Sequence, residues 1–263
     1  MRKEFVLVAV IILEFVISAY IFFAILGAPN DKYGLEFIYK GGPLVIVLLA
    51  LLMMAITFII ERSLSLMKAR GRGALANFLH NVQRNLMDGK VDTALEACNQ
   101  QRGSLANIIR AGLERYKFVN ARANGDQEKV ARETQRAIDQ ATMLEVPLLE
   151  KNLVALSTIA SIATMVGLLG TTIGMIRAFR ALAHAGAPDA VQLSVGISEA
   201  LINTAGGLAA AIIGIVFYNY FVTKVDKFTY MIDEASYSVT EILTGQVHEF
   251  NGFTDVKTEV GVN

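Results

Sequence analysis

The sequence predicts an all-α membrane protein, with long transmembrane helices that extend into a cytoplasmic helical region. The chain has 263 residues, of which 54% are hydrophobic, and its mean hydropathy is +0.46, which is too apolar for an ordinary soluble domain. Four stretches are apolar over the ~20 residues that a helix needs to cross a bilayer. The alternation of apolar and polar residues that marks a half-buried strand does not extend over any useful length.

Charge and residue usage exclude several function classes. The 24 basic and 24 acidic residues cancel, so bulk charge gives no indication of a nucleic-acid partner. Cys98 is the only cysteine, which excludes an internal disulfide and a multi-cysteine metal site. His80, His184 and His248 are scattered without the spacing of metal ligands. Because the spans hold no Ser-His or paired-aspartate constellation, we expect no enzyme, no catalytic residues, no resident cofactor and no metal site.

Residues 1–27 begin with Arg2 and Lys3 and continue as an apolar run. A secretory signal peptide has the same outline, but Glu14 interrupts the apolar core and no A-x-A cleavage site precedes Pro29. We therefore expect an N-terminal transmembrane helix. Glu14 then has two interpretations, a carboxylate paired with a neighbouring helix or a protonatable group on an ion path.

Residues 28–42 are polar and contain glycine, so we expect a loop on the periplasmic side. Residues 43–61 are expected to form the second transmembrane helix, because the run is uncharged up to Ile60. Basic residues gather at and after its end: Arg62, Lys68, Arg70 and Arg72. By the positive-inside rule this end lies in the cytoplasm, and Arg2 and Lys3 place the N-terminus there too.

Residues 62–151 are soluble in character and are expected to form the cytoplasmic helical region. Apolar residues recur at helical spacing in its first segment: Leu75, Phe78, Leu79, Val82 and Leu86. Asp88-Gly89 is expected to end that helix. A charged helical stretch begins at Gln127, and we expect Pro147 to bend or restart it.

Residues 152–176 carry no charge and are expected to form the third transmembrane helix. Small and hydroxyl residues follow one face of it: Ser157, Ser161, Thr164, Gly167, Thr171 and Gly174. This face either packs closely against another helix, as the G-x-x-x-G pair Gly170 and Gly174 favours, or provides hydroxyls along a path for a small cation. Both interpretations stay open for Thr171.

Residues 177–196 are expected to form a second periplasmic loop, although Arg177 and Arg180 go against the simple charge rule. Residues 197–223 are expected to form the fourth transmembrane helix. Residues 224–263 begin with basic residues and are expected to form a cytoplasmic C-terminal helix and tail. The chain would then cross the membrane four times, with both termini in the cytoplasm.

The first half of the fourth span is polar and small. Glu199 and Asn203 stand four residues apart and therefore share a helix face, whereas Thr204 lies well round from Glu199. Gly206 and Gly207 each have an alanine four residues further on, which lets a neighbouring helix approach closely. Polar atoms at membrane depth are costly unless they meet each other, water or a partner, so we expect this helix to line an interface or an ion path.

Two motifs in the last two spans resemble signature segments of the ExbB/TolQ/MotA ion-channel family. Gly167-Leu-Leu-Gly-Thr171, followed by Gly174-Met-Ile and Phe179, is similar to the family segment G-L-L-G-T-V-x-G-M-x-x-x-F. Gly196-Ile-Ser-Glu-Ala-Leu-Ile-Asn-Thr204-Ala, with Tyr218-Asn219 further on, is similar to G-I-x-E-A-L-x-x-T-A and the later Y-N. The Glu-Ala-Leu and Tyr-Asn elements favour the ExbB/TolQ branch over the flagellar stator branch.

The resemblance covers residues 43 to about 240, with three departures. Thr164 and Ile213 stand where the family has prolines, which leaves the local helix bends open. Thr172 stands where the family has valine, and its extra hydroxyl leaves open whether protons or sodium ions move. Residues 1–27 lie beyond the three-span core that is usual for ExbB.

The resemblance implies a subunit of an ion-driven motor in the bacterial inner membrane. It implies a ring of five copies around a central pore, enclosing two copies of an ExbD/TolR-like single-span protein with an intramembrane aspartate. Ion flow past that aspartate would couple the proton motive force to TonB-dependent import, through a TonB-like protein, or to other envelope work. The alternatives are a sodium-driven or gliding- or flagellar-stator-type motor subunit, and a secondary transporter, whose inverted repeats and broken helices do not show here. Membrane lipid is the other expected partner.

The resemblance also implies where the ion pathway lies. Thr171 and Thr204 would flank the partner's aspartate, and Glu199 would lie near the outer mouth, with Thr172 and Asn203 as further candidates. This agrees with physical expectation, because a buried carboxylate needs hydroxyls, water or a cation beside it.

Overall fold

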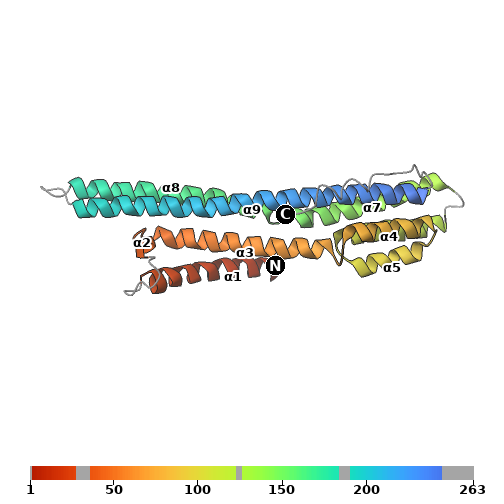
Figure 1. Cartoon of the computed structure of the whole chain (residues 1–263), viewed down its shortest axis with the longest axis horizontal. Coiled ribbons are helices and arrows are strands. Elements are labelled where there is room, and N and C mark those ends of the chain that lie inside the picture. Colours follow the sequence, from red (N-terminus) through yellow and green to blue (C-terminus); the bar gives the residue numbers. More distant parts are fainter. Residues whose placement is uncertain (1, 28–35, 123–125, 184–189, 245–263) are drawn as a thin grey trace. The chain divides into compact units, whose positions relative to one another are not determined.

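The computed structural model describes residues 2–27, 36–122, 126–183 and 190–244 (Figure 1). Within these ranges the backbone is helical apart from short turns, and no strand occurs. The elements in chain order are α1 (Arg2–Tyr20), the π-helical η1 (Ile21–Leu26), α2 (Glu36–Tyr39), α3 (Leu44–Arg70), α4 (Leu75–Met87), α5 (Val91–Gln101), α6 (Ser104–Asn120), α7 (Gln127–Glu150), α8 (Leu153–Ala183) and α9 (Ala190–Thr244).

Four of the described helical stretches are long and apolar enough to cross a membrane. The apolar runs that qualify them lie in α1 with η1, in α3, in α8 and in α9. The prediction of an all-α, multi-pass membrane protein is therefore confirmed.

The chain divides into two compact units. Unit 1 comprises Met1–Leu64 and Lys151–Thr223, and unit 2 comprises Ser65–Glu150 and Lys224–Asn263. The helices α3 and α9 contribute residues to both units. The apolar spans all fall in unit 1, which is therefore the membrane part of the chain.

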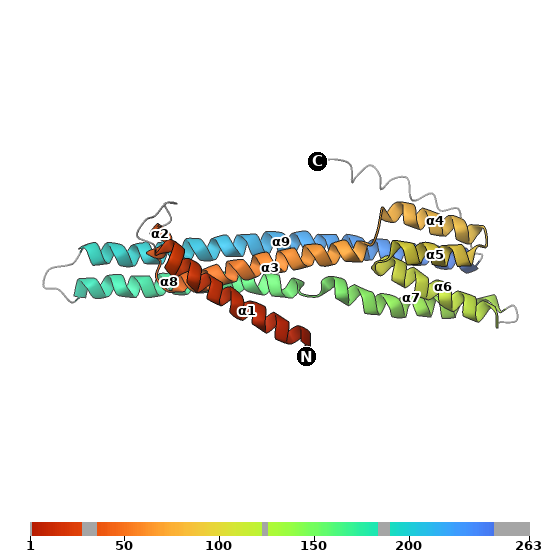
Figure 2. The ribbon, with the colours of Figure 1, turned by 90° about the horizontal axis from the view of Figure 1, so that it is seen from below.

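In unit 1, α1 packs against the beginning of α3 (Figures 1 and 2). The Ser18 hydroxyl donates a hydrogen bond to the Ile46 carbonyl at 2.5 Å. Phe22 is buried beside Val45, and its ring stacks on Tyr39 with the centroids 4.8 Å apart. Because η1 and α2 fold back over this end, α1 and α3 form the hairpin that the first two spans predict.

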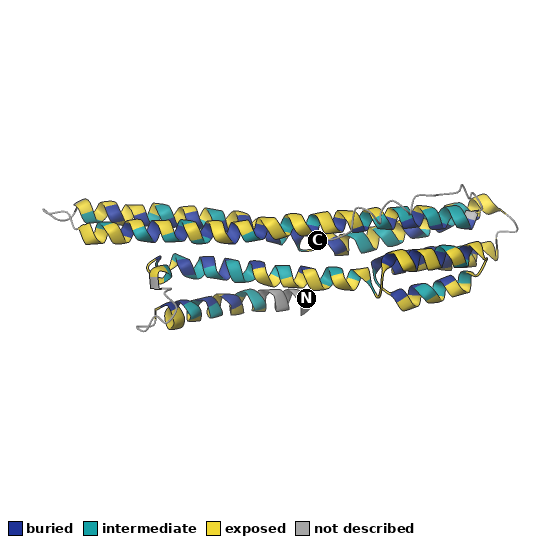
Figure 3. Cartoon of the chain, in the orientation of Figure 1, coloured by how far each residue is buried: buried dark blue, intermediate teal, exposed yellow. Residues whose placement is uncertain are grey.

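Also in unit 1, α8 lies antiparallel to the first part of α9, and the two helices stay side by side in both views (Figures 1 and 2). Buried alanines and leucines line their contact, while the outward faces are exposed (Figure 3). Asn152 precedes α8 with a φ of 63°, a left-handed conformation that ends the helix before it. The break expected at Pro147 therefore lies at Lys151–Asn152, because α7 runs through Pro147 to Glu150.

Unit 2 contains α4 to α7 and the C-terminal part of α9. All five residues that keep helical spacing in α4 are buried, so that prediction is confirmed. Gly89, with a φ of 72°, follows the end of α4 as the sequence predicts. The Gln83 side chain donates to the Ser238 hydroxyl at 2.8 Å and so ties α4 to α9. Arg115 of α6 pairs with Glu133 of α7.

Helix covers more of the chain than the sequence predicts around the expected loop 177–196. The helix α8 continues to Ala183 and α9 begins at Ala190, while 184–189 lie outside the described residues. The physical reason is that charged residues mark where an apolar span ends, and they do not end a helix. The helix expected after residue 223 is present as the continuation of α9 to Thr244, since residues 223–244 contain no glycine or proline. Parts of the expected loop 28–42 and of the tail also lie outside the described residues.

Candidate functional site

The contact between α8 and α9 is built on small residues. A Cβ atom added at Gly174 would lie 2.8 Å from the Cβ of Ala200, and one added at Gly207 would lie 2.6 Å from the Ala163 carbonyl oxygen. Gly170 faces the side chain of Asn203 with no room for a further atom. Since real Cβ atoms do not approach so closely, the two helix backbones can adopt this spacing only with glycine at these positions.

Gly206 lies on a different side of α9 from the other candidate packing glycines. A Cβ atom added there would meet only Leu48 of α3, at 3.3 Å from its Cδ1 atom. The paired glycines of α9 therefore serve two contacts, Gly207 toward α8 and Gly206 toward α3.

The second feature of the site is a polar cluster of five residues: Gly41, Gly42, Arg177, Glu199 and Asn203. Glu199 is only 5% exposed, and Arg177 of α8 donates a hydrogen bond to its Oε1 atom. Gly42 has a φ of 75°, and a Cβ atom there would lie 2.5 Å from the same carboxylate oxygen. Glu199 is therefore enclosed between α8 and the turn that precedes α3, and its charge is balanced by Arg177.

Asn203 lies one turn further along α9 and is fully buried. Its Nδ2 atom donates a hydrogen bond to the Gly41 carbonyl oxygen at 2.8 Å. Its Oδ1 atom is buried and has no hydrogen-bond partner among the described residues. Asn203 thus joins α9 to the residues before α3 and faces Gly170 of α8 at the same time.

The candidate hydroxyls lie at the edge of the α8–α9 contact. Thr171 and Thr204 are half-buried, and Thr172 is exposed. Each hydroxyl donates to a carbonyl of its own helix: Thr171 to Leu168 at 2.6 Å, Thr172 to Leu169 at 2.7 Å, and Thr204 to Ala200 at 3.2 Å. The helix register sets Gly170 against Asn203 and Gly174 against Ala200, so Thr171 and Thr204 lie within one turn of each other along the pair.

This arrangement leaves the two threonine oxygens with free lone pairs. A hydroxyl that donates to its own helix can still accept a hydrogen bond from a protonated carboxyl group or coordinate a small cation. Between residues 152 and 176, and from 200 to 223, the two helices carry no charge of their own. The hydroxyl groups therefore provide polar contacts at a depth where an approaching charge would otherwise have none.

The structure brings together Glu199, Asn203 and Gly170, and it sets Thr171, Thr172 and Thr204 apart from that polar cluster. Sequence reasoning missed Arg177, Gly41 and Gly42. Arg177 follows the third apolar run and falls within the expected loop 177–196. Its distance of 22 positions from Glu199 gives no local signal, because the pairing depends on the register of two antiparallel helices.

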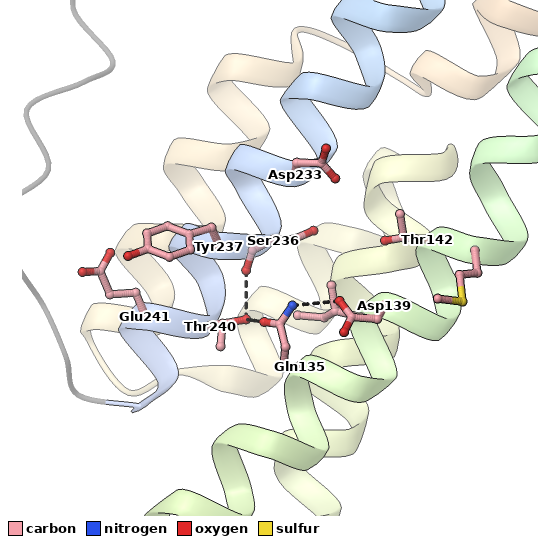
Figure 4. A pocket seen from close by; sticks show the side chains of 10 residues that line it. Gln135, Asp139, Thr142, Asp233, Ser236, Tyr237, Thr240 and Glu241 are labelled. Atoms are coloured by element: carbon pink, nitrogen blue, oxygen red, sulfur yellow. Dashed lines mark hydrogen bonds between the residues drawn. The ribbon is translucent and has the colours of Figure 1, made fainter.

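Unit 2 has a groove between α7 and α9, whose labelled side chains include Asp139, Asp233 and Glu241 (Figure 4). The Thr240 hydroxyl donates to Gln135 Oε1 at 2.9 Å, and the Gln135 Nε2 atom donates to Asp139 at 2.8 Å. These bonds tie groove residues to one another. Within the ranges that the structure describes, no three His, Cys, Asp or Glu side chains are placed to hold a metal ion.

Comparison with known proteins identifies a family for this arrangement. The sequence model of the MotA/TolQ/ExbB proton channel family matches residues 100–234, just over half of the chain. The match includes Thr171, Glu199 and Thr204, and it leaves out α1.

Named relatives agree with the family match. The chain is 37% identical over 114 residues to the Tol-Pal system protein TolQ of Pseudomonas aeruginosa, covering 43% of this chain and 49% of the relative. It is 40% identical over 105 residues to TolQ of Haemophilus influenzae, covering 40% of this chain and 45% of that protein. It is 30% identical over 211 residues to the biopolymer transport protein ExbB of Pseudomonas putida, covering 76% and 60%. The chain thus spans about half the length of the first two relatives and 60% of the third.

Proposed function

The chain belongs to the MotA/TolQ/ExbB proton channel family, and from this premise we propose that it is the ion-pathway subunit of an inner-membrane motor. In this proposal the proton motive force drives the motor, with an ExbD/TolR-like single-span protein as its partner. The work done is TonB-dependent import or another task at the cell envelope. The relatives named TolQ and ExbB favour this branch over the flagellar stator branch.

One observation carries the proposal. Two half-buried threonines, Thr171 and Thr204, lie within one turn of each other at the edge of a helix pair that is otherwise uncharged at this depth. Their hydroxyl oxygens are open to a group that approaches from outside the chain. An aspartate on a partner helix is the group that needs such neighbours, in both its protonated and its ionised form.

We propose that five copies form a ring around the partner helices. Large apolar side chains cover the outward faces of α8 and α9, and six of them are at least 48% exposed: Met165, Leu168, Leu169, Leu201, Leu208 and Ile212. Lipid and neighbouring copies would cover these faces, since van der Waals packing drives helix association in membranes. The number five rests on the family resemblance.

Native mass spectrometry in mild detergent tests the assembly. Copurification with an ExbD/TolR-like single-span protein should give five copies of this chain with two of the partner. The matched control is the partner with its intramembrane aspartate changed to alanine, which should assemble but give no motor output. A chain that remains monomeric in every mild detergent, with or without the partner, would contradict the proposal.

The membrane orientation is part of the same proposal. By the positive-inside rule, Arg2, Lys3, Lys224 and Lys227 favour a cytoplasmic location for both termini and for residues 73–150. Reporter tags at residue 1, within 73–150 and at residue 263 should therefore report cytoplasm. Tags within 30–40 and 183–190 should report the periplasm, and an external C-terminus would contradict this orientation.

A further inference from the structure

Glu14 is the one charged residue between Phe5 and Leu26, and its side chain is buried. Glu14 and Ser18 on the inward face of α1 are buried, and so is Phe22 at the start of η1. The opposite face is apolar and exposed, and includes Leu13, Val16 and Tyr20. A carboxyl group thus lies on the side of α1 that packs against the rest of unit 1 instead of on a solvated side.

Among the described residues, the surroundings of Glu14 offer its carboxyl group no hydrogen-bond partner. Its side chain is 5% exposed, and neither carboxyl oxygen has a hydrogen-bond partner among the residues that the structure describes. Because Ser18 bonds to Ile46 and the two helices are antiparallel, Glu14 lies one turn away at the level of Ala50, which is 1% exposed.

The elements that pack on α1 supply no charge at this level. In α3 the run from Leu44 to Ile60 contains no titratable residue. Tyr39 and Lys40 follow the other end of α1, where Tyr39 stacks on Phe22 two turns from Glu14. At that same end α9 contributes the apolar Ile202, and its Glu199, which is paired with Arg177, lies against Gly42, about two turns of α3 away from Ala50.

An ionised carboxylate in such a place is strongly disfavoured. Transfer of an unpaired ion into an apolar interior costs so much that the group stays neutral instead. The neutral acid, in contrast, loses only the hydrogen bonds of one hydroxyl and one carbonyl group. The burial of Glu14 against an uncharged helix therefore selects the protonated form.

We propose that Glu14 is a proton-binding site in α1, separate from the hydroxyls of α8 and α9, and that it holds its proton while α1 is packed on α3. The bound species is H⁺, and the site is a neutral carboxylic acid between two membrane helices. Loss of the proton leaves a charge that only water or a cation can satisfy. Proton release and the packing of α1 on α3 are therefore coupled.

A hydrophobic carbodiimide tests this assignment on the full chain in lipid nanodiscs. A protonated carboxyl group adds to dicyclohexylcarbodiimide: its proton goes to a carbodiimide nitrogen, its oxygen bonds to the central carbon, and the acyl group then moves to nitrogen as a stable adduct. Peptide mass spectrometry at pH 7 should place this adduct on Glu14, with a yield that falls as the pH is raised.

Two carboxylates of the same chain serve as controls. Glu199 is buried but paired with Arg177, and Glu61 is bonded through both oxygens to Arg62 at 2.7 and 2.8 Å. Because each of these carboxylates is bonded to an arginine, both are expected to give at least tenfold less adduct than Glu14. The Glu14→Gln variant should lose the adduct and keep its thermal midpoint, because glutamine has the shape of the neutral acid.

Infrared spectroscopy tests whether Glu14 carries a proton, and its result does not depend on whether the carbodiimide reaches the side chain. The folded protein at pH 7 should show the carbonyl band of a protonated carboxylic acid, and Glu14→Gln should remove that band. A band that this variant removes supports the proposal even where no adduct forms. A spectrum at pH 7 without a protonated-acid band that depends on Glu14 would overturn it.

Discussion

Arg177 of α8 donates a hydrogen bond to Glu199 of α9, and this ion pair joins the two helices beside the turn that precedes α3. Glu199 is buried, whereas the side chain of Arg177 is 52% exposed. The pair thus has one partner that depends on the other for neutralisation and one that water can solvate. This asymmetry decides how substitutions at the two positions differ.

Arg177→Gln is expected to destabilise the protein more than Glu199→Gln does. The first change leaves a buried carboxylate without its cation, whereas the second leaves an arginine that water reaches. We expect the difference to be about 1–2 kcal/mol, below the range for fully buried pairs because Arg177 is half exposed. Thermal unfolding of the purified protein measures it. The double variant should recover most of the loss, and equal losses in the two single variants would contradict this view of the pair.

Glu199→Gln also tests whether this carboxylate does more than hold the helices together. If Glu199 also gathers cations at the outer mouth, the glutamine variant should assemble at normal levels but give lower motor output. Energy-dependent uptake or envelope integrity provides the measurement, with immunoblotting to confirm protein levels. Normal motor output of this variant at normal protein levels would show that Glu199 has only a structural role.

Asn203→Ala is expected to cost about 1–3 kcal/mol, because it leaves the Gly41 carbonyl without its donor in a buried position. The matched control is Asn219→Ala, since Asn219 is exposed on the same helix and should change stability by less than about 0.5 kcal/mol. The thermal midpoint of both variants in the same detergent gives the comparison. Similar midpoints would show that the Asn203–Gly41 bond does not stabilise the fold.

Gly170→Ala and Gly206→Ala should behave in opposite ways although both raise helix propensity. The first puts a methyl group into the Asn203 side chain, so α8 and α9 must separate and assembly should fall. The second places its methyl group 3.3 Å from the end of the flexible Leu48 side chain, which can shift. Size-exclusion chromatography measures assembly in each case. Normal assembly of Gly170→Ala would mean that the α8–α9 contact is looser than described.

Burial raises the pKa of the Cys98 thiol in α5 to about 12. Only the thiolate attacks alkylating reagents, so a raised pKa lowers reactivity, and at pH 8 roughly one thiol in ten thousand is ionised. Maleimide labelling of the folded protein should therefore be slow and become fast in denaturant. Gln100→Cys provides an exposed thiol nearby as a control in the same helix. Fast labelling of native Cys98 would contradict the burial of this core.

Local patterns in the sequence predicted much of the membrane unit and part of unit 2. The apolar runs gave the four spans, and helical spacing put Glu199 and Asn203 on one buried face. The core of α4 was predicted in full, because its buried residues recur at three- and four-residue intervals. These features depend on neighbours along one helix, which a sequence displays directly.

The features that the sequence did not predict depend on contacts between distant segments. The Arg177–Glu199 pair requires the register of α8 against α9, and the Asn203–Gly41 bond joins residues 162 positions apart. The separate roles of Gly206 and Gly207 also follow only once α3 is placed beside α9. Spacing alone could show that the glycines permit a close approach, but not which helix approaches.

The central claim is that the hydroxyls of Thr171 and Thr204 act on the ion path, and one substitution series tests it most directly. Valine keeps the shape of threonine but removes the hydroxyl. Thr158→Val is the matched control, because Thr158 is exposed on α8 and makes the same bond back to its own helix, to Val154 at 2.8 Å.

The measurement is energy-dependent uptake or envelope function in cells that carry each variant as the sole copy, with assembly checked in parallel. We expect Thr171→Val and Thr204→Val to form normal rings with at least tenfold lower motor output, and Thr158→Val to match the unmodified protein. Full output from both Thr171→Val and Thr204→Val, in normally assembled rings, would contradict the account and leave these threonines as packing residues.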